Sequence, residues 1–154
     1  MSFADIINTK KLEMAQEVTG DGIHLHLAAA VLMYDVMISD GLIDEMEVAN
    51  MVEILRNRYA LSAEEISEMI RMAREIVEDK HSRQLFATQL RNSLAHDERE
   101  QLLNDFWSLA SADWLIKDNE RDAIAKIGHY LALSDEEIQR ARFRAETKLE
   151  LHSV

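Results

Sequence analysis

The chain has 154 residues, enough for one domain with a sizeable core, and its 47% hydrophobic and 30% charged residues are typical of a globular protein. The formal net charge of −12 argues against nucleic acids and anionic membranes as partners, and it favours cations or basic protein surfaces. The chain contains no cysteine, which excludes disulfides and thiolate metal sites.

The composition favours helices, because there is no proline and there are only four glycines. Apolar residues at helical spacing and capping signals predict helices over about 3–18, 23–39, 44–59, 62–80, 82–94, 97–110, 118–132 and 134–149. We therefore expect an all-α, single-domain bundle of about seven to eight helices. Residues 1–22 are expected to form an N-terminal helix and loop, and residues 23–150 the main domain.

The most apolar stretch, residues 23–38, is expected to be the buried central helix of the bundle. It carries His24, His26 and Asp35 and is too short to span a bilayer. The first residues also lack the basic and apolar regions of a signal peptide. These features predict a cytoplasmic protein that does not insert directly into a membrane.

An acidic turn occurs twice in the sequence. The stretch from Asp40 to Glu47 has an Asp, one residue, Leu-Ile, three residues and a Glu, and the same order returns from Asp113 to Glu120, 73 positions later. The capping signal at 62–66 returns 72 positions later, at 134–138. This pattern indicates an internal duplication, with repeats of about 23–80 and 96–150 that we expect to pack about a pseudo-twofold axis.

The repeated acids suggest a cation site. Asp40, Asp44 and Glu47 in the first turn, and Asp113 and Glu120 in the second, offer the oxygen ligands that hard divalent cations prefer. A second interpretation stays open, because acids at helix starts commonly cap backbone N–H groups and interact with the helix dipole. Asp44 and Glu47 have the spacing of such a cap.

Other known sites are not supported. Gly41-Leu42 interrupts the pattern of an EF-hand loop, and a di-iron bundle would need Glu-x-x-His on two helices, whereas the motif occurs once, at Glu78 and His81. His96 and His129 are expected to be packing or surface residues. There is no glycine-rich phosphate loop and no nucleophile motif, so we expect a protein that is not an enzyme; a two-metal carboxylate hydrolase is the remaining catalytic alternative.

The paired acidic turns resemble those of the TerB-like family of helical proteins, associated with tellurite resistance and stress response. The resemblance rests on residues 28–47 with 61–66, and again on 110–120 with 133–138. It implies an all-helical bundle whose acidic residues bind a divalent cation. A related domain heads a membrane-anchored DnaJ-like co-chaperone, which implies a role in protein interaction. Trp114 and Lys117 depart from the family pattern in the second turn.

The sequence thus predicts a non-enzymatic, TerB-like module that binds a divalent cation (Ca²⁺, Mg²⁺, Mn²⁺ or Zn²⁺) through the repeated acidic turns. The alternative is a metal-free protein-interaction scaffold or co-chaperone-like module. In either case we expect a protein partner and a monomer or homodimer.

Overall fold

The computed structural model is all-helical over the part of the chain that it describes, residues 22–39, 41, 43, 45–79, 81–111 and 116–152. These residues form seven helices: α2 (Gly22–Met37), α3 (Glu45–Tyr59), α4 (Ala63–Ile76), α5 (Ser82–Ser93), α6 (His96–Ala110), α7 (Asp118–Tyr130) and α8 (Asp135–His152). The prediction of an all-α bundle is confirmed. The N-terminal helix and loop expected over residues 1–22 lie almost entirely outside the described residues.

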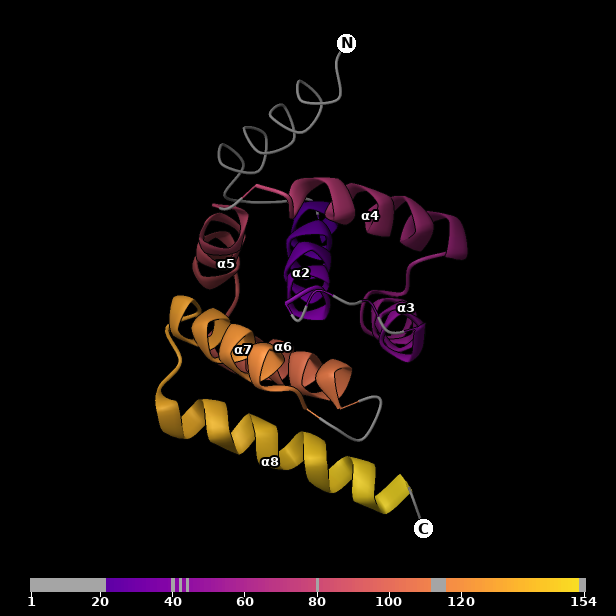
Figure 1. Ribbon diagram of the computed structural model, residues 1–154. Coiled ribbons are helices and arrows are strands. Elements are labelled where there is room, and N and C mark those ends of the chain that lie inside the picture. The colour runs from indigo at the N-terminus through magenta and orange to yellow at the C-terminus, as the bar shows by residue number, and fades with distance from the viewer. Residues whose placement is uncertain are drawn as a thin grey trace.

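Helix α2 is the centre of the bundle, as its apolar sequence predicts. Its side chains from Leu27 to Met37 are buried apart from Asp35, which is partly exposed. The small residues at 28–30 let neighbouring helices approach closely, and α4 and α5 make the main contacts with α2. Figure 1 shows α2 in indigo, with α3, α4 and α5 around it and α6 beneath it.

Helix α4 shows how a surface helix is fixed in this bundle. Ile66, Met69, Ala73 and Ile76 are buried, and their spacing of three and four residues places them on one face. The helix begins at a capping box, in which the Ser62 hydroxyl accepts a hydrogen bond from the backbone of the third helical residue. It ends at Ile76, earlier than the predicted end near residue 80.

The second half of the chain forms a layer against α2, with α8 on its outer side (Figure 1). Trp107 of α6 is fully buried, and its indole N–H donates to the carbonyl of Ile138 in α8 over 3.2 Å. The Arg142 guanidinium lies 5.3 Å from the centre of the Trp107 ring, which adds a cation–π contact. Arg142 thus packs against α6 while its Nε donates to Glu146 on α8 over 2.9 Å.

Helix α3 is joined to α6 by polar contacts. Asn50 Nδ2 donates to the carbonyl oxygen of Ser108 over 2.9 Å. Arg58 donates to both carboxylate oxygens of Asp105 over 2.8 and 2.7 Å, and Asp105 is only 7% exposed.

None of the described helices combines the length and the apolar character needed to cross a membrane. The cytoplasmic location stays a prediction.

Candidate metal centres

The two acidic turns place one carboxylate each in the protein interior. Glu47 and Glu120 are the third residues of α3 and α7, and both are 0% exposed. The other three predicted ligands, Asp40, Asp44 and Asp113, lie outside the described residues.

Backbone geometry explains how these turns enter the helices. Gly41 has a φ of +84° and its N–H donates to the carbonyl of Ile38 over 2.9 Å, so it takes the left-handed position that commonly ends a helix. In the second turn, Glu120 Oε1 accepts a hydrogen bond from the backbone N–H of Lys117 over 3.3 Å. Lys117 makes no capping bond with its side chain, because an ammonium group cannot accept one.

The capping interpretation is thus confirmed for Glu120, and it leaves room for a second role. A carboxylate has two oxygens, and the bond to Lys117 uses Oε1. Glu47 and Glu120 both take part in further interactions, as expected for buried carboxylates, which need hydrogen-bond donors or cations around them. Capping and cation binding are therefore compatible on the same side chain.

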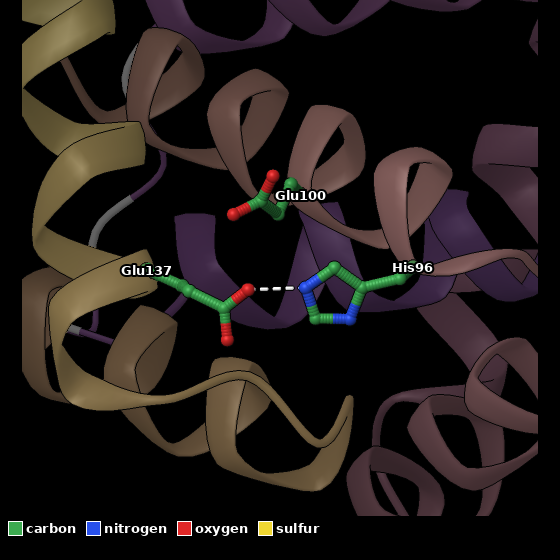
Figure 2. A group of neighbouring side chains, drawn as sticks. All are labelled: His96, Glu100 and Glu137. Atoms are coloured by element: carbon green, nitrogen blue, oxygen red, sulfur yellow. Dashed lines mark hydrogen bonds and ion pairs between the residues drawn. The ribbon is translucent and has the colours of Figure 1, made fainter.

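A second group of possible ligands lies between α6 and α8. His96 and Glu100 are four residues apart on α6, and Glu137 is the third residue of α8. One donor atom from each lies within 4.8 Å of the other two. Figure 2 shows the three side chains facing one another across the space between the two helices, with His96 Nε2 bonded to Glu137 Oε2.

Arginine side chains supply the positive charge at this second group. Arg140 Nη2 donates to Glu100 Oε1 over 2.6 Å and lies 3.9 Å from Glu137 Oε2. The hydrogen bond that Arg140 donates to Glu100 raises the pKa of Arg140. The backbone N–H of Ser134 and the imidazole of His96 lower the pKa of Glu137 to about 2. The Glu137 carboxylate is therefore ionised at neutral pH, which is the state that binds metal.

Two sequence-based expectations change here. The helix predicted to begin near residue 97 begins at His96, and Glu98 accepts a hydrogen bond from the backbone N–H of Ala95 over 3.0 Å. His96 is a surface residue as expected, but its grouping with two glutamates was missed. The spacing of His96 and Glu100 was visible in the sequence, whereas the approach of Glu137 requires α8 to pack on α6.

Two other polar regions contain none of the predicted ligands. A cleft of about 400 Å³ is lined by residues of α2, α5 and α7 and the segment after α4, including the Asp35–Arg83 ion pair and Lys126. His26 stacks on Tyr59 with ring centres 4.1 Å apart, and burial lowers the pKa of His26. The cleft contains both positive and negative side chains, and the two rings of the stack pack directly against each other. Neither region therefore resembles a cation site.

The described structure is an all-helical domain with buried carboxylates at two helix starts. A model of the family described as "Tellurite resistance protein TerB" matches residues 26–143. That span is well over half of the chain, so the chain belongs to the TerB family. Comparison with curated proteins and with solved structures gives no match.

Proposed function

We propose that this TerB-family domain is a non-catalytic module that binds a divalent cation through its two acidic turns. Glu47 and Glu120 would be the inner ligands, with Asp40, Asp44 and Asp113 supplying further oxygens. The single observation that carries the proposal is the complete burial of both glutamates beside these turns. Burying two carboxylates is costly in their charged form, a cation would offset that cost, and oxygen ligands suit Mg²⁺, Ca²⁺ or Mn²⁺.

The substitution Glu120→Gln distinguishes cation binding by this side chain from helix capping. Glutamine keeps an oxygen that accepts from the Lys117 N–H but is a far weaker ligand for a hard cation. If Glu120 binds metal, the variant folds and its cation affinity falls at least about 10-fold. Mutating a residue that only hydrogen-bonds to a metal ligand already causes a loss of this size. If Glu120 only caps the helix, affinity is unchanged.

The experiment is calorimetric titration of chelator-treated protein with Mg²⁺, Ca²⁺, Mn²⁺ and Zn²⁺. Wild type is compared with Glu120→Gln and with the pair Asp40→Asn and Asp113→Asn. The matched control is the pair Asp118→Asn and Asp122→Asn, since those acids are exposed in the first turns of α7 and removing them changes the net charge equally. Saturable binding in wild type and control, weakened in the turn variants, supports the proposal. Equal titrations in all four proteins contradict it.

An interaction scaffold is the second candidate, and exposed apolar side chains near the first turn favour it. Ile43 is 48% exposed and Met46 is 54% exposed, directly beside Glu47. Such residues in the rim of an acidic turn suit a partner with a basic and apolar surface. Met46→Lys should then abolish co-purification of a partner from native lysate, whereas Phe143→Lys, on α8 and 69% exposed in the wild type, should leave it intact.

A further inference from the structure

The group formed by His96, Glu100 and Glu137 differs chemically from the acidic turns. It offers one imidazole nitrogen and two carboxylate oxygens, whereas the turns offer oxygen alone. Nitrogen ligands favour Zn²⁺ and other first-row transition ions over Mg²⁺ and Ca²⁺. A site of this composition would therefore select a different cation from the one that the turns bind.

Helix geometry makes two of the three ligands a preformed pair. His96 and Glu100 are separated by four residues, so their side chains lie on the same face of α6, one turn apart. The same spacing holds metal ligands in other helical sites. Glu137 is fixed on the opposite side by its capping box, in which its Oε1 accepts the Ser134 N–H over 2.9 Å. Its other oxygen, Oε2, is the one that contacts His96.

The imidazole can present Nε2 to a metal. Metal binding through Nε2 requires the proton on Nδ1. Arg99 Nη2 lies 3.5 Å from Nδ1, at the limit of a hydrogen bond, while Nη1 of the same side chain donates to the carbonyl of Leu131 over 2.6 Å. The Arg99 guanidinium is therefore held mainly by Leu131, and its weak contact with Nδ1 is the one that must break for Nδ1 to carry the proton.

Arg140 supplies the positive charge that a bound metal would supply to Glu100 and Glu137. Its guanidinium lies against Glu100 and near Glu137, and its side chain is 47% exposed. A divalent ion would compensate the same two carboxylates more completely, while Arg140 can turn into solvent without burying its charge. Arginine and metal would thus compete for one pair of carboxylates.

We propose that His96, Glu100 and Glu137 form a Zn²⁺-type site in which the metal displaces Arg140 and joins the first turns of α6 and α8. Three protein ligands leave a position for water or for a side chain of another molecule. The proposal stands independently of the acidic turns, since it uses none of their residues.

The chain supplies a matched control in the pair of His129 and Asp135. His129 Nε2 lies 2.6 Å from Asp135 Oδ1, both side chains are exposed, and no third donor joins them among the described residues. This pair has the same two chemical groups as His96 and Glu137 without the second carboxylate. It therefore reports how much affinity a surface histidine and one acid supply alone.

The test is titration of chelator-treated protein with Zn²⁺, and with Co²⁺ as a spectroscopic probe, in the background Asp40→Asn and Asp113→Asn. That background weakens the proposed turn site, so binding that remains belongs elsewhere. Each variant is first checked for helix content and thermal unfolding. The variants His96→Ala, Glu100→Gln and Arg140→Ala are compared with the control His129→Ala.

The expected result is one Zn²⁺ bound per chain in the background protein and in His129→Ala. His96→Ala and Glu100→Gln should each weaken binding at least about 10-fold, and Arg140→Ala should tighten it because the competing cation is gone. The proposal is overturned if the background protein binds no Zn²⁺, or if His96→Ala and His129→Ala weaken it equally. If the wild-type protein binds no Mg²⁺ or Ca²⁺, that result contradicts the proposed site at the acidic turns and leaves the Zn²⁺ site unaffected.

Discussion

The corner between α3 and α4 and the corner between α7 and α8 are built from the same local devices. Each joins its helices through an alanine with positive φ, Ala60 at 54° and Ala132 at 62°. Each alanine is followed by a buried leucine and then by a serine, Ser62 or Ser134. The serine hydroxyl caps the next helix, and the glutamate three residues later accepts a hydrogen bond from the serine N–H. Both corners also have a buried glutamate near the start of the first helix, Glu47 and Glu120.

The two corners differ in what holds them to the rest of the bundle. Arg58, two residues before Ala60, forms two bonds to Asp105 of α6, whereas the residue two positions before Ala132 is Tyr130, which carries no such charge. Gly128, four residues before Ala132, lets α8 approach α7 closely, whereas the residue four positions before Ala60 is the exposed Arg56. The two corners thus share their local capping and differ in their tertiary contacts. The pseudo-twofold arrangement of the halves stays a prediction.

The largest effect is expected from breaking the ion pair that distinguishes the first corner. Arg58→Met leaves the 7%-exposed Asp105 without its bidentate cation, and we expect a loss of about 3 kcal/mol in the free energy of unfolding. Urea unfolding at neutral pH measures it. Arg121→Met removes an exposed pair with Asp118 and should cost less than about 1 kcal/mol. Equal losses in the two variants would show that the Arg58 pair contributes no more than a surface contact.

The same corner should respond to alkaline pH through Tyr59. Burial, and then the charge of Asp105, raise the pKa of Tyr59 from 10.0 to about 12. A folded-state pKa above the unfolded value stabilises the protein fully below pH 10, and that stability is lost as the pH rises towards 12. The shift corresponds to about 3 kcal/mol at most.

The variant Tyr59→Phe has no phenol to ionise, so its free energy of unfolding should fall less than that of wild type between pH 10 and pH 12. Tyr130→Phe is the matched control, because Tyr130 is the last residue of α7 as Tyr59 is of α3. Urea unfolding of the three proteins across this range measures the difference. Parallel curves for wild type and Tyr59→Phe would contradict the buried, protonated phenol.

At the second corner we expect the largest loss of stability from a change in packing rather than from the loss of a charge. A Cβ added at Gly128 would lie 2.7 and 2.8 Å from Cγ1 and Cδ1 of Ile138, so Gly128→Ala should cost about 2 kcal/mol. The double variant with Ile138→Ala removes both atoms of the clash. We expect Gly128→Ala to cost almost nothing in that background, measured as a double-mutant cycle by thermal unfolding. A full cost in both backgrounds would place the strain elsewhere.

The helices, the capping boxes at Ser62 and Ser134 and the left-handed Gly41 could be predicted from sequence, because each depends on residues within one or two turns of chain. The start of α6 at His96, one residue before the predicted start, shows the limit of this method, because a shift of one residue changes which glutamate caps the helix. Contacts across the bundle had no sequence signal. Arg58 and Asp105 are 47 residues apart, and Glu137 reaches His96 only once α8 has packed on α6.

The smallest effect is expected at the feature that the two corners share most closely. Ala60 and Ala132 are exposed and adopt left-handed backbone, which is unfavourable for a residue with a Cβ. Glycine removes that strain but has more freedom to lose on folding, so Ala60→Gly and Ala132→Gly should each stabilise by about 0.5 kcal/mol. Ala63→Gly, inside the first turn of α4, is the control and should destabilise. If the corners are equivalent, the two gains are equal and add in the double variant; unequal gains in urea unfolding would show that tertiary contacts reach even these turns.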